Sequence, residues 1–260
     1  DNWKRLTAGE SGIKTVTRFP LDSMKTTMAG AVDFVTVDPF SSTSLSQRLA
    51  EIAAEEALEQ SGIGSKGDFP GPLFLAVAPI ETEWPQRLEV ARDVPTKDFG
   101  IIEYLATCSG GKFAHFHRRF TFGSVALSLA ETFGTKGSPI SLSTACASGA
   151  TAIQLGVEAI RRGETDATLC IATDGSVNPE AMVRFSLLSA LSTQNDPPQA
   201  ASKPFSKNRD GFVMAEGAGA LVLESYDAAI ARGARILGVV AGCGELTDSF
   251  HRTRSAPDGK

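Results

Sequence analysis

Cys146 is the residue of this chain whose setting best suits a nucleophile. It stands in the run TACASGA, residues 144–150, after an apolar stretch at 140–143 that is typical of a strand. Alanine and aliphatic residues then recur at helical spacing over 150–162. A thiol at such a junction is favoured as a thiolate by the helix N-terminus, and a tight turn presents it in a cleft. The alternative is a buried, inert cysteine, which is the commoner fate of a free thiol.

The spacing of apolar residues around Cys146 predicts strands alternating with helices. We predict helices over 44–60, 99–107, 124–133, 150–162 and 227–232, and strands over 73–78, 140–143, 167–172 and 220–223, with an extended run at 236–242. Glycines follow several of the helices and should end them, among them Gly62, Gly134 and Gly163. Alternation of this kind favours an α/β layering.

A second block of sequence, KPFSKNRDGFVMAEGAGA at 203–220, leads into the apolar run LVLE. Shorter matching stretches are Trp3, LTAGESGI at 6–13, ALST at 190–193 and TDSFHRT at 247–253. In their order these motifs resemble those of the β-ketoacyl-acyl-carrier-protein synthases of the thiolase superfamily, closest to the type II elongation enzymes. The resemblance covers nearly the whole chain and is strongest from about Phe122 onward.

The resemblance implies a thiolase-like layered α/β/α fold, the first half of a duplicated αβαβα architecture. Residues 1–230 would form the N-terminal half that bears the nucleophile, and residues 231–260 would begin the second half. Relatives carry two catalytic histidines and a lysine in that second half. The chain has three histidines, His115, His117 and His251, and none stands in such a motif. We therefore expect a fragment that is inactive in condensation by itself.

The activity implied is that of an acyltransferase of fatty acid biosynthesis. Cys146 would accept an acyl group from a carrier thioester, and malonyl-ACP would then condense with it by decarboxylation. The backbone N–H of Cys146 would help to stabilise the oxyanion. Phe185 matches a family aromatic residue of the acyl tunnel, and Thr253 falls where relatives contact the malonyl or pantetheine group. The alternatives are one more core phenylalanine and a plain turn threonine.

The basic segment KFAHFHRRF, residues 112–120, is the candidate surface for an acidic partner. The resemblance implies acyl carrier protein as that partner, with Lys112, Arg118 and Arg119 as docking residues. The alternative is a solvated loop or helix end. A net charge of −5 argues against a nucleic-acid binder.

Composition excludes several other classes of protein. The four cysteines Cys108, Cys146, Cys170 and Cys243 have no metal-ligand spacing, so we expect reduced thiols, a cytoplasmic protein, and neither metal nor cofactor. No apolar run is long enough to span a membrane. The run EGAG at 216–219 lacks the spacing of a phosphate loop, and its glycines are predicted to permit close packing of a strand against its neighbour.

Two alternatives to the enzyme remain open from sequence. A non-catalytic thiolase-fold partner, or a chain-length-factor-like scaffold that binds acyl carrier protein, would also fit the lack of the two histidines. A cysteine hydrolase is weaker, because no histidine can be assigned beside Cys146. The resemblance also implies a homodimer.

Overall fold

A computed structural model describes residues 2–95, 100–251 and 255–259 of the chain. The chain divides into two compact units, and the segments that form them alternate along the sequence. Unit 1 comprises Asp1–Asp33, Val177–Glu216 and Leu237–Lys260, and unit 2 comprises Phe34–Ser176 and Gly217–Ile236. These units group residues by their contacts, whereas the predicted boundary at residue 230 separates two halves of a duplicated architecture. The predicted boundary therefore stays a prediction.

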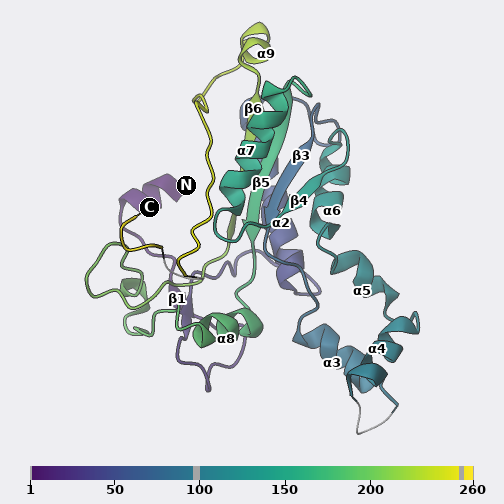
Figure 1. Cartoon of the computed structure of the whole chain (residues 1–260), viewed down its shortest axis with the longest axis vertical. Coiled ribbons are helices and arrows are strands. Elements are labelled where there is room, and N and C mark those ends of the chain that lie inside the picture. Colours follow the sequence, from purple (N-terminus) through teal and green to yellow (C-terminus); the bar gives the residue numbers. More distant parts are fainter. Residues whose placement is uncertain (1, 96–99, 252–254, 260) are drawn as a thin grey trace. The chain divides into compact units, whose positions relative to one another are not determined.

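Unit 2 contains the main sheet and most of the helices (Figure 1). Its strands are β3 (Leu73–Val77), β4 (Ile140–Leu142), β5 (Ala167–Asp174) and β6 (Gly217–Glu224). Its helices are α2 (Ser42–Ser61), α3 (Trp84–Arg92), α4 (Ile101–Ser109), α5 (Ala114–Arg119), α6 (Ser124–Phe133), α7 (Ser148–Arg161) and α9 (Tyr226–Ala231).

The four strands of this sheet are ordered β4-β3-β5-β6. β3 pairs in parallel with both β4 and β5, whereas β5 pairs antiparallel with β6 along eight residues of each strand. β4 and β6 therefore form the two edges of the sheet.

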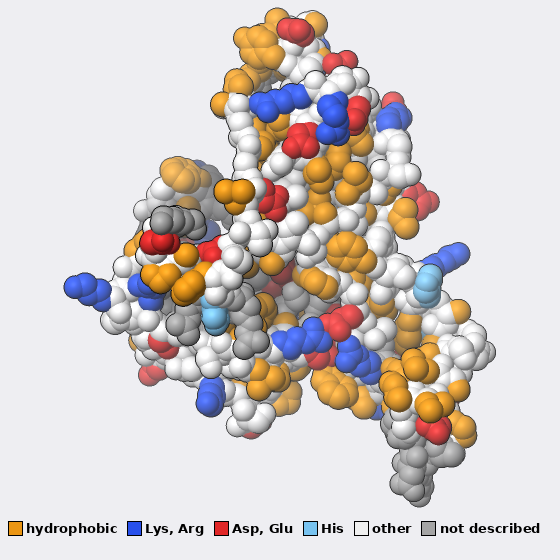
Figure 2. All heavy atoms as spheres, viewed as in Figure 1, with side chains coloured by type: hydrophobic (Ala, Val, Ile, Leu, Met, Phe, Trp, Pro, Cys, Tyr) orange, Lys and Arg blue, Asp and Glu red, His pale blue; other side chains and the backbone are white. Residues whose placement is uncertain are grey.

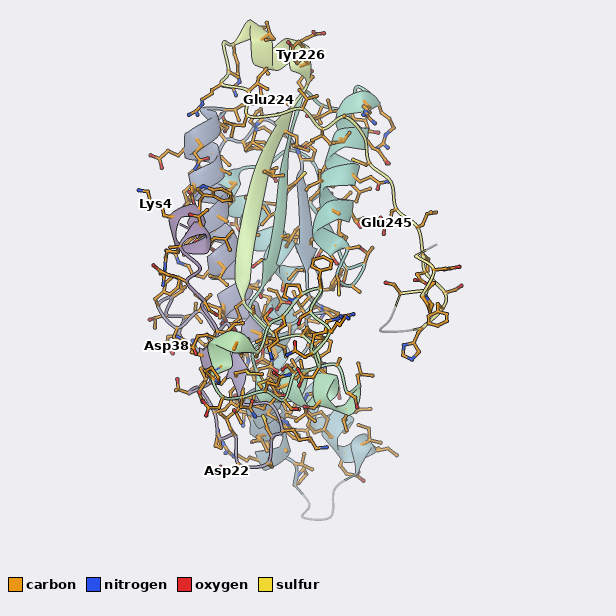
Figure 3. The ribbon with its side chains drawn as sticks, turned by 90° about the vertical axis from the view of Figure 1, so that its left-hand side faces the viewer. Lys4, Asp22, Asp38, Glu224, Tyr226 and Glu245 are labelled. Carbon is orange, nitrogen blue, oxygen red and sulfur yellow. The ribbon has the colours of Figure 1, made fainter. Side chains whose placement is uncertain are left out.

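Helices cover both faces of the sheet and make unit 2 a three-layered α/β/α structure, as predicted. Figure 3 shows the sheet between α2 and α7, with β6 toward the viewer and the labelled Glu224 at its end. Alternate residues of β3 face opposite layers: Leu73 and Leu75 pack in one cluster with α2 and α6, and Phe74 packs in another with α7. This period of two is what a strand buried on both faces requires.

Local sequence signals account for the ends of the two helices on the α2 face. Ser41 caps α2, because its side chain accepts a hydrogen bond from the Ser44 N–H at 3.0 Å. Gly62 and Gly134 end α2 and α6 with φ angles of 62° and 63°, a left-handed conformation that favours glycine. The observed α6 has the bounds that its sequence predicts.

Unit 1 is built on a smaller core. It contains α1 (Asn2–Thr7), the antiparallel pair β1 (Lys14–Thr15) and β2 (Met28–Ala29), α8 (Pro179–Leu187) and a short 3₁₀ helix at Pro198–Ala200. The buried residues of its core are Val16, Ala29, Ala31, Val177 and Met182.

Several details of the predicted fold are wrong. β6 begins at Gly217 rather than Ala220, and a Cβ added at Gly217 or Gly219 would meet no atom within 4 Å among the described residues, so these glycines do not serve close packing there. The helix predicted over 150–162 begins two residues earlier, at Ser148. The apolar run at 236–242 forms no strand in the described part of the chain.

None of the described helices is both long and apolar enough to cross a bilayer.

Candidate active site

The chain makes a tight elbow at Cys146. β4 ends at Leu142, α7 begins at Ser148, and the cysteine lies exposed between them. Ala145, the residue before it, has φ of 53°, a left-handed conformation that is uncommon for a residue with a side chain. Strained backbone of this kind is often found at functional sites. The predicted strand-turn-helix junction is therefore confirmed in its geometry.

Hydroxyl groups hold this elbow in shape. The Thr144 N–H donates to Ser148 Oγ at 2.8 Å, and that hydroxyl donates in turn to the Ala145 carbonyl oxygen at 2.5 Å. The side-chain oxygens of Thr144 and Thr151 share a further hydrogen bond of 2.8 Å. Because these bonds span the turn on both sides of Cys146, they restrict the conformations from which its thiol can react. Ser148 was not predicted to have this role, because it is the first residue of α7 and not its N-cap, which is Ala147.

The helix behind Cys146 lies unusually close to the sheet. A Cβ added at Gly156 of α7 would come within 2.5 Å of Cys170 Sγ and 2.8 Å of Thr168 Oγ1, both on β5. About two turns nearer the cysteine, a Cβ at Gly149 would lie 3.2 Å from that of Ala172. Only small residues allow α7 to pack this close to β5. This packing fixes the distance between α7 and the sheet, and so the position of the N-terminus of α7.

Cys170, in contrast to Cys146, is a buried cysteine. Its side chain is buried, with 4% of its surface exposed, and its thiol donates to the Ala152 carbonyl oxygen at 3.4 Å. Burial raises the pKa of this thiol to about 11, against a weaker lowering by the hydrogen bond with Thr168. Cys170 is therefore a neutral packing residue at physiological pH.

We expect the alkaline stability of the protein to reflect Cys170. An unfolded chain loses this thiol proton near pH 9, whereas the folded chain keeps it up to about pH 11, so the free energy of unfolding should fall as pH rises between these values. At about 1.4 kcal/mol per pH unit, the decline attributable to this thiol is roughly 2–3 kcal/mol. Denaturant unfolding at a series of pH values would measure it. Cys170→Ala should remove that part of the decline and Cys243→Ala, at an exposed site, should not; equal slopes in all three proteins would contradict the assignment.

The basic segment forms the short helix α5 and the turns beside it. Lys112 is ion-paired with Asp93 at 2.6 Å on the surface. Arg118 and Arg119 have no carboxylate within 4.0 Å among the described residues. Both arginines line a cavity of about 640 Å³ whose apolar walls include Phe116 and Phe120.

Phe185, another predicted site residue, belongs to unit 1. Phe185 lies on α8, is 37% exposed, and packs its ring edge-on against Phe212 with 5.3 Å between centroids. Thr253 lies outside the described residues. The described residues contain no group of three or more His, Cys, Asp or Glu side chains that could hold a metal ion.

Known proteins are similar in sequence to nearly the whole of this chain. Residues 116–229 match the family model described as "Beta-ketoacyl synthase, N-terminal domain". The chain is 31% identical over 268 residues to the tetracenomycin polyketide synthase ketoacyl synthase alpha subunit of Streptomyces glaucescens, and 32% identical over 265 residues to 3-oxoacyl-[acyl-carrier-protein] synthase 2 of Vibrio cholerae. Each match covers 99% of this chain and 61% of the relative. Over residues 116–229 the chain therefore carries the N-terminal domain of the β-ketoacyl synthases.

Solved structures of β-ketoacyl synthases share its thiolase-like fold. A β-ketoacyl synthase from Burkholderia phymatum superposes with a TM-score of 0.66 at 26% identity, covering 90% of this chain and 56% of that one. A type II polyketide ketosynthase bound to a hexaketide, in complex with its acyl carrier protein, gives a TM-score of 0.66 at 30% identity and covers 55% of that chain. The chain thus spans a little over half the length of the synthases it matches.

Proposed function

We propose that this chain carries the acyl-accepting site of a β-ketoacyl-ACP synthase of fatty acid biosynthesis, with Cys146 as its nucleophile. The observation that supports this most directly is the exposed thiol at the strained elbow before α7. A chain-length-factor-like scaffold has no use for a reactive cysteine at this position. Residues 1–230 would form the half of the thiolase architecture that bears the nucleophile, and residues 231–260 would begin the second half, with the boundary at the end of α9.

The first half-reaction follows from this placement. The Cys146 thiolate attacks the carbonyl carbon of an acyl thioester, a new carbon–sulfur bond forms, and the bond to the carrier's sulfur breaks. The carrier leaves as a thiolate and takes up a proton. Because one thioester replaces another, the exchange is nearly balanced in free energy. The N–H of Cys146 would donate to the oxyanion, and Phe185 would contact the acyl chain.

The second half-reaction belongs to the complete protein. Malonyl-ACP loses carbon dioxide, and the carbanion attacks the acyl-Cys146 carbonyl and releases the thiolate. The resemblance assigns stabilisation of the enolate to two histidines of the family, and none of His115, His117 and His251 matches them. It assigns contact with the malonyl or pantetheine group to Thr253. No cofactor is required by these steps.

Mass spectrometry tests the acyl-accepting role directly. The protein is incubated with an acyl-ACP thioester at neutral pH, digested, and searched for the acyl mass on the peptide that holds Cys146. We expect the adduct on this cysteine. A folded sample without an adduct would contradict the enzyme and favour the non-catalytic scaffold.

Acyl carrier protein is the proposed partner, with Lys112, Arg118 and Arg119 as its docking residues. The support is local charge: two arginines without a carboxylate partner in the described part of the chain flank a cavity on a protein whose net charge is −5. Such a patch would attract an acidic helix and orient it.

Reversing one of these charges should weaken carrier docking. Because Arg118 is exposed, we expect Arg118→Glu to raise the dissociation constant for acyl carrier protein about tenfold at low salt, with a smaller effect at high salt. Surface plasmon resonance or calorimetry would measure it. Arg235→Glu makes the same change at an exposed site on the chain after α9, and an equal loss in both variants would refute docking at α5.

A homodimer in the cytoplasm completes the proposal. The edge strand β4 leaves Ile140 44% exposed, and Leu127 of α6 is 62% exposed. Figure 2 shows apolar side chains gathered over α4 as well, where Ile101 and Ile102 are exposed. A bare sheet edge with apolar neighbours suits a two-fold interface with a second copy. The four free cysteines fit a reducing compartment.

A charge on this edge should break the dimer. We expect Ile140→Glu to shift the protein to a monomer in sedimentation velocity, because it buries an unpaired carboxylate at the proposed interface. Leu237→Glu, at an exposed apolar residue of unit 1, is the matched control. A wild-type monomer at micromolar concentration, or a dimer that persists in Ile140→Glu, would contradict this interface.

A further inference from the structure

Glu216 is a buried carboxylate with every hydrogen-bonding position in use. Its side chain has 0% of its surface exposed. Its Oε1 accepts from Arg18 Nη1 at 2.6 Å and from the Val177 N–H at 3.0 Å. Its Oε2 accepts from Arg18 Nη2 at 2.7 Å and from the Val32 N–H at 2.8 Å. Each oxygen thus binds one guanidinium N–H and one backbone N–H.

Arg18 is itself held in place. Its Nε donates to Asp33 at 3.0 Å and its Nη2 also donates to the Val32 carbonyl oxygen at 2.9 Å. Burial works to lower the pKa of Arg18, but the hydrogen bonds and charges of Glu216 and Asp33 together outweigh it and raise that pKa. The paired, charged groups make strong and directional hydrogen bonds, so the Glu216 carboxylate has little freedom to move.

The bond to Val177 connects this cluster to α8. Val177 directly precedes Asn178, which caps α8 by accepting from the Ala181 N–H at 2.7 Å. Val177 and Met182, each 1% exposed, are buried in the core of unit 1. The helix start is thereby fixed by a carboxylate, a cap and a packed side chain, and the helix that follows holds Phe185.

We propose that Glu216 is a positioning residue for acyl-chain selection, which fixes the start of α8 and through it the ring of Phe185. This rests on the proposed function, in which Phe185 contacts the acyl chain. Glu216 acts through the Val177 N–H and does not touch the substrate. The carboxylate is required because both of its oxygens accept hydrogen bonds, whereas a glutamine side chain has one acceptor oxygen. The amide N–H₂ of a glutamine would point at one of the two pairs of N–H donors that surround Glu216.

Hydrogen exchange tests the anchoring step without any substrate. In Glu216→Gln we expect the amide of Val177 to exchange about tenfold faster or more, because a hydrogen bond to a charged acceptor is lost. Amides of β5 in unit 2 should keep their rates. Glu59→Gln, the same change at an exposed residue of α2, is the control. An unchanged rate at Val177 would overturn the proposal.

Acylation of Cys146 tests the effect on selection. Initial rates are measured with a short and a long acyl-ACP thioester, and we expect Glu216→Gln to change the ratio of the two rates at least about threefold. A purely structural role would lower both rates by one factor, and a constant ratio would therefore refute the assignment. If Glu216→Gln does not fold, Arg18→Lys, which keeps the charge and loses the paired bonds, is tested in the same two ways.

The two experiments separate this inference from the proposed function. A wild-type protein that gains no acyl group on Cys146 would contradict the proposed function and the acyl role of Phe185 with it. The exchange rate at Val177 would still decide whether Glu216 anchors α8.

Discussion

Replacing Cys146 by alanine should abolish the acyl adduct that the wild-type protein forms with a carrier thioester. The thiol is exposed at the elbow between β4 and α7, where an incoming carbonyl carbon can reach it. The neighbouring hydroxyl of Ser148 cannot replace it, because that hydroxyl is engaged across the turn with Thr144 and Ala145. We expect the rate of adduct formation to fall by about 10³-fold or more, as when other enzymes lose their nucleophile.

Two further variants make this result specific. Cys146→Ser keeps the size of the side chain but offers a far weaker nucleophile at neutral pH, so it should also form little adduct. Cys243→Ala removes a thiol that is also exposed but lies outside the elbow, and this variant should be acylated at the wild-type rate. Persistence of the adduct in Cys146→Ala would assign the chemistry to another side chain.

The sequence predicts those parts of the fold that depend on local signals. α6 and its end at Gly134 could be predicted because a continuous apolar stripe stops at a glycine that adopts a φ of 63°. β6 was predicted only from Ala220 onward. Its first residues are glycine and alanine, which have low strand propensity, and they are strand because β5 pairs with them up to Asp174.

The site divides in the same way. The exposed position of Cys146 could be predicted because its neighbours in sequence form the turn that exposes it, and its role as nucleophile stays a prediction. Phe185 came from a family resemblance. The docking arginines came from the local clustering of basic residues, and the resemblance supplied only their partner, so both assignments remain predictions. The Arg18–Glu216 pair could not be predicted, since its members lie 198 positions apart and no local pattern joins a lone arginine to a glutamate in a glycine-rich run.

This ion pair should also dominate the stability of unit 1. Arg18→Met leaves the Glu216 carboxylate buried with only the N–H groups of Val32 and Val177, and we expect the free energy of unfolding to fall by about 3–5 kcal/mol. Glu216→Gln should cost less, because Arg18 keeps its bonds to Asp33. Urea unfolding followed by circular dichroism would measure both.

The double variant Arg18→Met/Glu216→Leu decides whether the cost lies in the unpaired charge. Two apolar side chains remove the charges together, so the double variant should be less destabilised than the sum of the single changes, and more stable than Arg18→Met alone. The exposed pair of Arg162 and Glu164 offers a control, since Arg162→Met should leave stability almost unchanged. Additive losses at Arg18 and Glu216 would show that the two side chains act independently, contrary to the geometry of the paired hydrogen bonds.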